Sequence, residues 1–357
     1  MEIRILPLPD DKKKTKFSDE SKLSFGRIFT DRMLLAEWEN GRGWVDARIE
    51  PYGPFLLDPA CMVFHYGQEI FEGLKAYKWH DGTIALFRPE MNARRFNRSA
   101  ERMCMPDVPE ELFVKGIEEL LRLERDWIPS AAGTSLYIRP TMIAVEPALG
   151  VKPADRYYFY VILSPVGAYY PAGFNPVRIM VEDKYVRAVP GGTGDAKTGG
   201  NYAASLKAAL EAKKKGFEQV LWLDGAQHRF VEEVGSMNMF FAYGDLVVTA
   251  PLTGSILGGI TRDSVVKLSG TLGFRVEERQ IDINELTADI ASGKVTEAFG
   301  SGTAAVITPV GHLAYRDQVR QIGNGGVGRL TQKLYDTLTG IQYGRIEDGF
   351  GWIRKIA

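Results

Sequence analysis

The chain has 357 residues, of which 45% are hydrophobic and 25% charged, and its 44 basic side chains nearly balance 45 acidic ones. These values are ordinary for a soluble globular protein of about two domains, and the near-zero net charge gives no reason to expect a nucleic-acid partner. The two cysteines, Cys61 and Cys104, are too few for a disulfide framework and lack the spacing of a zinc or redox pair. We therefore expect a reducing compartment, no metal site, and cysteines that are buried small hydrophobes rather than reactive thiols.

The N-terminal segment, residues 1–16, mixes prolines, acids and a basic run without an apolar core. It resembles neither a signal peptide nor a transit peptide, so we expect a solvated arm. Nowhere in the sequence do about eighteen uncharged apolar residues follow one another, as a membrane-spanning helix requires. We therefore expect a cytoplasmic protein without a membrane span.

Strand-like and helix-like patterns alternate through the first half of the chain. Short apolar runs predict strands, and apolar residues at helical spacing predict helices. On this basis we expect strands over 83–87, 135–143 and 157–163, and helices over 91–98 and 109–125. Glycine, proline and asparagine between two apolar runs mark 167–175 as the domain junction.

The second half repeats the alternation. We expect strands over 177–181, 220–223 and 240–249, and helices over 201–215, 262–268 and 284–292. In the first of these helices Ala203, Leu206 and Leu210 share one face and Gly216 is the expected C-cap, while Asn284 is the expected N-cap of the last. The prediction is an α/β (α+β) protein with domains over 1–166 and 177–357, joined by a linker over 167–176.

The densest glycine cluster, GGTGDAKTGGNY over 191–202, lies between a predicted strand and a predicted helix. It could be a plain connection whose glycines supply positive φ angles. It could also be a phosphate-binding P-loop, with Asp224 at the end of the next strand as a magnesium ligand, although Ala196 stands where that motif needs glycine. A third interpretation is that Lys197 is a covalent amine held rigidly by unusual backbone.

A lysine that binds pyridoxal phosphate needs three further groups: an acid at the ring nitrogen, a donor to the ring oxygen and an anion site for the phosphate. Each has a candidate in the second half of the chain. Glu233 precedes an apolar strand, and Tyr202 follows Lys197 by five residues. Gly258-Gly259 opens a helix, so the amides of Ile260 and Thr261 could face a dianion. Their joint presence favours the third interpretation.

Five strings now carry a family resemblance: FHYGQEIFEGLKAY (64–77), SLYIRP (135–140), GTGDAKTGGNYA (192–203), EEVGSMNMF (232–240) and FGSGTAAVITPV (299–310). From about Leu23 to the C-terminus the chain resembles a branched-chain amino-acid aminotransferase of the fold-type IV pyridoxal-phosphate enzymes. The resemblance implies a smaller N-terminal α/β domain and a larger C-terminal domain, with the cofactor in the cleft. It also implies a homodimer in which the partner helps to close the active site.

The resemblance assigns cofactor roles to individual positions. Lys197 is the lysine that holds pyridoxal 5'-phosphate and moves the substrate proton. Glu233, rather than Glu232, pairs with the ring nitrogen, and Tyr202 donates to the ring oxygen. The remaining cofactor positions are Arg95, Arg187, Ser236, Ile260, Thr261 and Thr303.

Substrate contacts follow in the same way. Thr303 and Ala304 resemble the donors to the substrate α-carboxylate, with the hydroxyls of Tyr66 and Tyr137 nearby. Aromatic walls from Phe29, Phe71 and Tyr137 suit a branched aliphatic side chain. Arg139 is the candidate for the second carboxylate of glutamate, with a structural ion pair as the alternative. Ala305 and Thr308 replace the CxxC thiols of the mammalian branch, so no redox switch is expected there and a bacterial-type enzyme is indicated.

The reaction implied is a reversible ping-pong transfer of the amino group. L-leucine, L-isoleucine or L-valine would exchange it with 2-oxoglutarate to give branched-chain 2-oxo acids and L-glutamate. A D-amino-acid transaminase or an aminodeoxychorismate lyase of the same fold type is the alternative. From other classes, a P-loop nucleotide-binding protein and a noncatalytic relative stay open.

Overall fold

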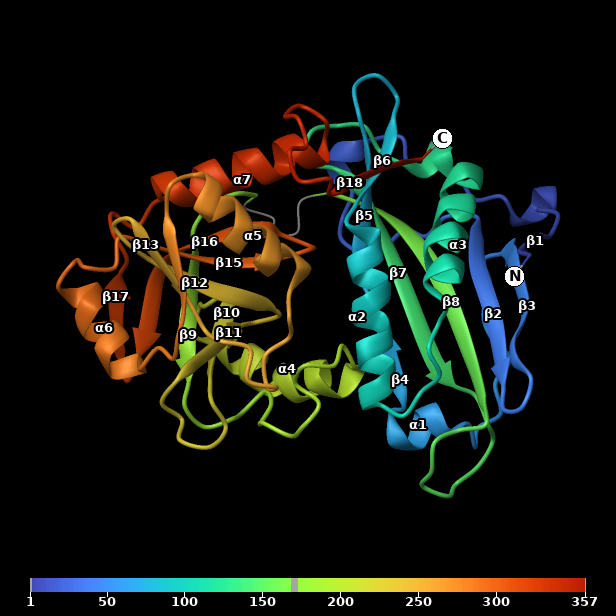
Figure 1. Ribbon diagram of the computed structural model, residues 1–357, viewed down its shortest axis with the longest axis horizontal. Helices are drawn as coiled ribbons and strands as arrows, with labels where there is room; N and C mark the ends of the chain where they lie inside the picture. The colour runs from blue at the N-terminus through green and yellow to red at the C-terminus, as the bar shows by residue number, and fades with distance from the viewer. Residues whose placement is uncertain (1, 168–172, 357) are drawn as a thin grey trace. The chain divides into compact units, whose positions relative to one another are not determined.

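The computed structural model describes residues 2–167 and 173–356 (Figure 1). The chain divides into two compact units. Unit 1 comprises Met1–Tyr169, Ala196–Gly199 and Gly340–Ala357, and unit 2 comprises Tyr170–Asp195 and Gly200–Thr339. Residues 168–172 of the predicted linker lie outside the described residues, and the predicted domain ranges stay a prediction. The predicted first domain does not include Ala196–Gly199 and Gly340–Ala357, which belong to unit 1.

Unit 1 is built on a nine-stranded sheet of order β1-β3-β2-β8-β7-β5-β6-β18, with β4 paired to β7. All the pairs are antiparallel except β1 with β3. The strands are β1 (Arg4–Ile5), β2 (Arg32–Glu39), β3 (Gly43–Pro51), β4 (Glu69–Phe71), β5 (Leu74–Lys78), β6 (Ile84–Phe87), β7 (Ser135–Ala144), β8 (Arg156–Val166) and β18 (Ile353–Ile356). Its helices are α1 (Met62–Tyr66), α2 (Pro89–Arg102) and α3 (Glu110–Leu123).

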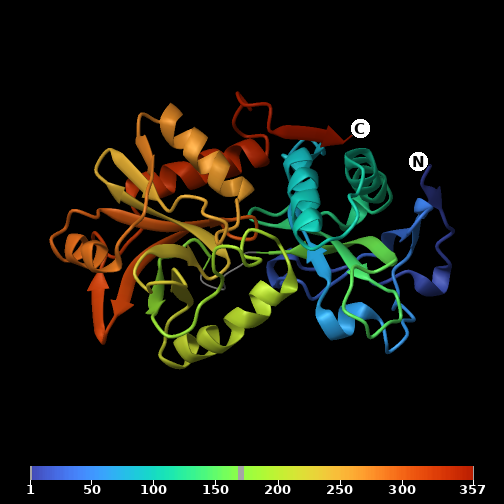
Figure 2. The same ribbon diagram turned by 60° about the horizontal axis from the view of Figure 1, so that its bottom comes forward.

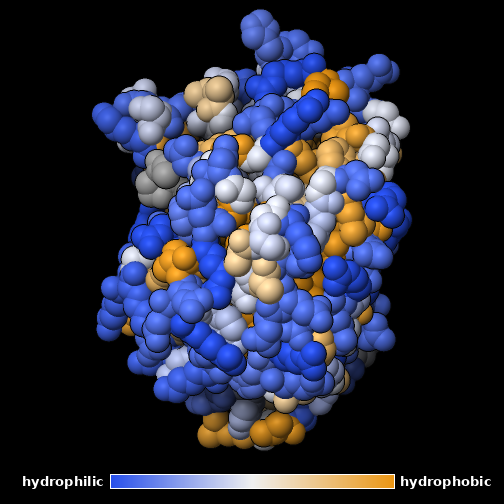
Figure 3. All heavy atoms as spheres, turned by 90° about the vertical axis from the view of Figure 1, so that its left-hand side faces the viewer, coloured by the Kyte–Doolittle hydropathy of each residue, from blue (hydrophilic) through white to orange (hydrophobic). Residues whose placement is uncertain are grey.

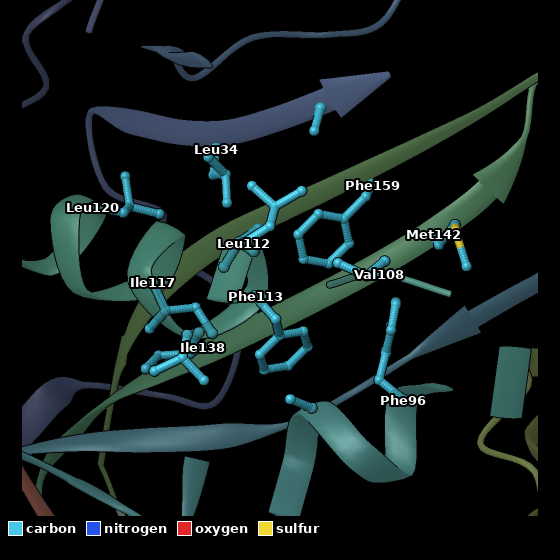
Figure 4. Packing of buried hydrophobic residues seen from close by; sticks show 14 of the residues in the cluster. Leu34, Phe96, Val108, Leu112, Phe113, Ile117, Leu120, Ile138, Met142 and Phe159 are labelled. Carbon is cyan, nitrogen blue, oxygen red and sulfur yellow. The ribbon is translucent and has the colours of Figure 1, made fainter. Parts of the chain in front are cut away.

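The core of unit 1 lies between its sheet and the helices α2 and α3. Phe96 of α2 and Phe113 of α3 pack around Phe159 of β8, with ring centroids 5.5 and 5.9 Å from it (Figure 4). Along β7 the residues Leu136, Ile138 and Met142 belong to this core. Side chains alternate between the two faces of a strand, so Tyr137 and Arg139 point to the other face. The candidate site of unit 1 is built on that face.

Two expectations for unit 1 are corrected by the structure. The N-terminal arm is not simply solvated, because β1 pairs with β3, and the Lys14 amide donates to Asp31 at 2.8 Å while its ammonium lies over the Tyr52 ring. We expected both cysteines to be buried, but only Cys61 is, since Cys104 is exposed. The predicted strands and helices of this half are confirmed, with boundaries shifted by a few residues.

Unit 2 contains a second nine-stranded sheet, of order β11-β10-β9-β16-β15-β12-β13-β14, with β17 paired to β16. An additional pairing of β11 with β12 joins two strands that are separated in this order, and so closes part of the sheet into a ring. The strands are β9 (Val177–Glu182), β10 (Gln219–Leu223), β11 (Val231–Val234), β12 (Met237–Tyr243), β13 (Leu246–Thr249), β14 (Arg275–Glu278), β15 (Glu297–Gly302), β16 (Val306–Tyr315) and β17 (Gln318–Gln321).

Helices accompany the sheet of unit 2. They are α4 (Gly199–Lys214), α5 (Ile260–Thr271), α6 (Ile283–Ala291) and α7 (Arg329–Gln342), the first and last of which reach into the segments assigned to unit 1. In both ribbon views α4 and α5 lie on opposite sides of this sheet (Figures 1 and 2). The face that carries α6 and β17 is mainly hydrophilic, with scattered apolar residues (Figure 3).

Three expectations for unit 2 are wrong in detail. The run 240–249 is two strands, β12 and β13, because Gly244 turns the chain at φ 64°. The N-cap of α6 is Asp282, whose carboxylate accepts from the amide of Asn284 at 2.7 Å. Helix α4 buries Asn201, Ala208 and Ala212, whereas Leu206 and Leu210 are 67% and 52% exposed. Within the described residues, no helix combines the length and apolar character that crossing a bilayer demands.

Candidate active site

Lys197 is held in unit 1 by hydrogen bonds of both its backbone amide and its backbone carbonyl. Its amide donates to the hydroxyl of Ser99 at 2.9 Å, and its carbonyl accepts from the amide of Phe71 at 2.9 Å. The Nζ atom lies 4.8 Å from the centroid of the Phe71 ring. The reactive amine predicted from the sequence is therefore attached to a fixed backbone and lies over an aromatic face, as a covalent amine requires.

Arg95 of α2 makes a buried ion pair with Glu72, the residue that follows β4. Its Nε and Nη2 atoms lie 2.6 and 2.9 Å from the two carboxylate oxygens, and Asn92 donates to the same carboxylate at 2.7 Å. Burial would raise the pKa of Glu72, but the charge and hydrogen bonds of Arg95 and the charge of Lys197 outweigh it, so the pKa is lowered. Sequence reasoning missed Glu72, although it lies within the quoted string FHYGQEIFEGLKAY.

Arg139 lies over two of the predicted aromatic walls. Its guanidinium carbon is 4.7 Å from the centroid of Phe71 and 5.3 Å from that of Tyr137, and it donates to the Tyr137 hydroxyl at 3.2 Å. Phe25, which the sequence did not suggest, packs edge-on against Tyr137 at 4.8 Å. Lys197, Phe71, Tyr137 and Arg139 thus form one cluster of cationic and aromatic side chains.

The structure gives the other two predicted pocket residues different neighbours. Phe29 stacks on Tyr52 with ring centroids 5.4 Å apart. Tyr66 is 40% exposed at the end of α1, and its hydroxyl donates to the carbonyl of Leu149. These contacts connect neither residue to the Lys197 cluster, and the assignment of both to the substrate pocket stays a prediction.

In unit 2 the predicted ring-nitrogen acid is deeply buried. Glu233 of β11 is 3% exposed and lies 2.7 Å from Nη1 of Arg187. Arg187 also donates to the carbonyl of Ser255 at 3.1 Å, and Asn238 of β12 donates to Glu233 at 3.3 Å and to the carbonyl of Leu257 at 2.9 Å. The two residues that sequence reasoning assigned separately, Arg187 and Glu233, are therefore partners.

The start of α5 packs against the same network. Its N-cap residue is Gly259, which has no side chain that could bond the first helix amides. A Cβ on Gly259 would overlap the amide oxygen of Asn238. Ile260 and Thr261 are the first residues of the helix. Because helix N-termini favour anions, this arrangement is compatible with the predicted phosphate site at the start of α5, near the buried carboxylate. That pairing fits a phosphorylated pyridine cofactor.

The remaining predicted positions lie on turns or at the start of a helix in unit 2. Ser236 is exposed in the tight turn between β11 and β12, and Tyr202 is partly buried in the first turn of α4. Thr303 and Ala304 are partly buried in the connection from β15 to β16. This connection ends at Val306, which has φ 61°, a conformation that is unusual for a β-branched residue.

A second carboxylate in β11, Glu232, was set aside by sequence reasoning. Its neighbour Ser255 donates to it, and it lines a cavity of about 190 Å³ together with Thr253, Phe230 and Ile256. Burial raises the pKa of Glu232 to about 7. Glu232 and Glu233 thus occupy different environments although they are adjacent.

The P-loop alternative loses its magnesium ligand in the structure. The carboxylate of Asp224 accepts hydrogen bonds from the backbone amides of Ala226, Gln227, Arg229 and Phe230. These bonds close the turn after β10, so the carboxylate has a structural role. Among the described residues, no group of three or more histidine, cysteine, aspartate or glutamate side chains is arranged to hold a metal ion.

The structure has two mixed α/β units, with a clamped lysine in one and a buried carboxylate near the start of α5 in the other, as expected for a fold-type IV aminotransferase. A family model described as amino-transferase class IV matches residues 69–313. The chain belongs to this family.

Similar proteins and structures agree with this assignment. The chain is 53% identical over 339 residues to branched-chain-amino-acid aminotransferase 2 of Bacillus subtilis, covering 95% of this chain and 93% of that protein. Its structure is similar to that of the Escherichia coli branched-chain amino acid aminotransferase, with a TM-score of 0.74, 28% identity and coverage of 90% and 99%. It is also similar to the branched-chain amino acid aminotransferase of Thermobaculum terrenum in its PLP-bound holo form, with a TM-score of 0.73, 25% identity and coverage of 91% and 98%.

Proposed function

We propose that the protein is a branched-chain amino-acid transaminase that depends on pyridoxal 5'-phosphate. It transfers the amino group reversibly between L-leucine, L-isoleucine or L-valine and 2-oxoglutarate. The observation that carries the proposal is the position of Lys197, with its backbone fixed by Phe71 and Ser99 and its amine over the Phe71 ring. The chain's 53% identity over most of its length to a protein named for this activity supports the substrate class.

When bound, pyridoxal phosphate supplies an aldehyde that joins amines and a ring that accepts electrons. Lys197 Nζ would hold the cofactor and, as a free amine, would move the proton between the substrate Cα and C4′ of the cofactor. The Glu233 carboxylate pairs with the ring nitrogen and is itself held by Arg187 and Asn238. Tyr202 donates to the ring oxygen. The remaining cofactor positions, which hold mainly the phosphate, are Arg95, Arg187, Ser236, Ile260, Thr261 and Thr303.

Substrate recognition combines aromatic walls with anion donors. Phe29, Phe71 and Tyr137 exclude water from the branched side chain, whose full burial is worth about 1.5–3 kcal/mol. The backbone amides of Thr303 and Ala304 bind the α-carboxylate, with the hydroxyls of Tyr66 and Tyr137 nearby. Arg139, which already rests on Phe71 and Tyr137, binds the second carboxylate of 2-oxoglutarate.

The protein acts in the cytoplasm as a homodimer with small-molecule substrates. Large apolar side chains support dimerisation, because Leu56, Phe64, Leu149 and Val151 are 60–100% exposed. They belong to segments that are joined locally, since the amide of Ala148 donates to the carbonyl of Ala60. Apolar groups exposed together on a single chain mark interaction surfaces.

Substitution of Lys197 by alanine tests the proposed function. The variant should lose the visible absorbance of the lysine-bound cofactor and all turnover of L-leucine with 2-oxoglutarate. Lys207→Ala on α4, whose side chain is 63% exposed, is the matched control and should keep both. The wild-type absorbance should bleach with L-leucine and recover with 2-oxoglutarate. Retention of turnover in Lys197→Ala, or bleaching by D-alanine instead, would overturn the proposal.

A further inference from the structure

Strand β4 holds the Lys197 segment at three successive residues. The amide of Phe71 donates to the Lys197 carbonyl at 2.9 Å, and the Thr198 hydroxyl donates to the Glu69 carbonyl at 2.8 Å. The amide of Gly199 donates to the carboxylate of Glu69. Together with the bond from the Lys197 amide to Ser99, these bonds form a clamp that extends from the lysine to the first residue of α4. One bond of this clamp, that of Gly199, depends on an ionisable side chain.

Strand β4 is itself firmly placed in unit 1. Glu69, Ile70 and Phe71 pair with Ile143, Met142 and Thr141 of β7. Ile70 is completely buried and belongs to the core between the sheet and its helices. A carboxylate on this strand therefore has a rigid base from which to fix a neighbouring loop.

The Glu69 carboxylate suits this task in both distance and charge. A Cβ on Gly199 would overlap it, so a larger residue at 199 would require the carboxylate to shift. Gly199 is the first residue of the sixteen-residue helix α4, where the exposed amides favour an anion. Burial raises the pKa of Glu69, while the Gly199 amide and the charge of Arg139 act in the opposite direction.

We infer that Glu69 is a positioning residue for Lys197, and that its side chain fixes the 197–199 backbone by accepting the Gly199 amide. The inference rests on the proposed role of Lys197. Glu69 does not take part in proton transfer, and it acts only through the main chain two residues beyond the lysine. The remaining bonds of the clamp come from backbone groups, Ser99 and Thr198, so the contribution of this side chain can be removed separately.

Hydrogen exchange of the cofactor-free protein measures the clamp directly. In Glu69→Ala the amides of 197–199 should exchange at least about tenfold faster, while those of β7 keep their wild-type rates. Glu69→Gln should restore slow exchange, because its amide oxygen can still accept the Gly199 amide. Glu119→Ala on α3, whose side chain is 42% exposed, is the control for loss of an acid and should change neither segment.

Kinetics of the holoenzyme supply the second measurement. A misplaced lysine slows the chemical step, so Glu69→Ala should lower kcat by about 10- to 100-fold and change KM for L-leucine less than threefold. Glu69→Gln should recover kcat to within about threefold of the wild type. Wild-type exchange and kcat in Glu69→Ala would overturn the inference, as would a Gln variant as impaired as the Ala variant. If the wild-type protein shows no cofactor absorbance, the proposed function fails, while the exchange data still report whether Glu69 fixes the segment.

Discussion

Glu232 and Glu233 are adjacent in β11 and are both buried, yet their surroundings differ. Glu233 lies against Arg187, whereas Glu232 accepts from Ser255 and faces a small cavity lined in part by apolar side chains. Burial is the largest influence on Glu232, and Glu233 and Asp224 add further negative charge. The pKa of Glu232 is about 7, so this carboxyl group is half-protonated near neutral pH.

Substitution of Glu232 by glutamine should change how stability depends on pH. Between pH 4.5, the ordinary pKa, and pH 7 the unfolded chain releases a proton that the folded protein retains. Folding therefore weakens as pH rises through this window, by up to about 3 kcal/mol, and the loss is complete above pH 7. Glu232→Gln stays neutral, so it should gain stability relative to the wild type over the same window.

Urea unfolding of the cofactor-free protein from pH 4 to 8 measures this difference. Glu277→Gln, which removes a half-exposed acid on β14, is the control and should follow the wild-type curve. If the Glu232→Gln and wild-type curves run parallel from pH 4.5 to 7, the raised pKa of Glu232 is refuted.

At the scale of elements, the structure confirms the predicted helices and strands, with the run 240–249 divided into two strands. The sequence indicated the wrong buried face for one helix and the wrong N-cap for another. Leu206 and Leu210 suggested the buried side of α4, whereas small residues at 208 and 212 allow the helix to pack closely. Asn284 and Asp282 are both good capping residues, and only the fold decides that Asp282 stands at the N-cap. Local pattern cannot settle choices that depend on neighbours distant in sequence.

The residues of the candidate site also fall into two groups, those that the sequence predicts and those that only the fold reveals. Lys197, Glu233 and the start of α5 belong to compact strings, so a single sequence suffices to propose them. Glu72, Ser99 and Asn238 act through partners brought together by folding, such as Ser99 and Lys197, which are 98 residues apart. No local pattern reports such pairs, which is why sequence reasoning missed them.

The cap of α6 provides a test at this scale. Asp282 accepts from the amides of Asn284 and Glu285 and also pairs with Arg229. Asp282→Ala should cost about 1–2 kcal/mol of unfolding free energy at pH 7, and Asp282→Asn, which keeps the cap, should cost less. Arg229 and the helix amides lower the pKa of Asp282 despite its burial. Its contribution is therefore present above pH 4 and is lost as pH falls, so urea unfolding at pH 3 should show a smaller gap between variant and wild type.

For the whole molecule, the exposed apolar residues predict association. Leu149 and Val151 are 66% and 84% exposed. Replacing both by aspartate would place charges in a buried interface, so the double variant should be a monomer by sedimentation velocity at concentrations where the wild type is a dimer. Val319→Asp on β17, where the side chain is 50% exposed, is the control and should remain dimeric. A monomeric wild-type protein would contradict the proposed homodimer.

The division of the chain into two units also constrains the order in which its parts can fold. Unit 1 takes its edge strand β18 from residues 353–356, which pair with β6 more than 260 residues earlier. A chain emerging from the ribosome can fold most of that sheet early, but it cannot complete the edge until residues 353–356 have emerged. Until then β6 presents an unpaired edge to the crowded cell, and nascent chains are open to pairing with one another. Pairing of β18 with β6 is therefore the step that ends this exposure.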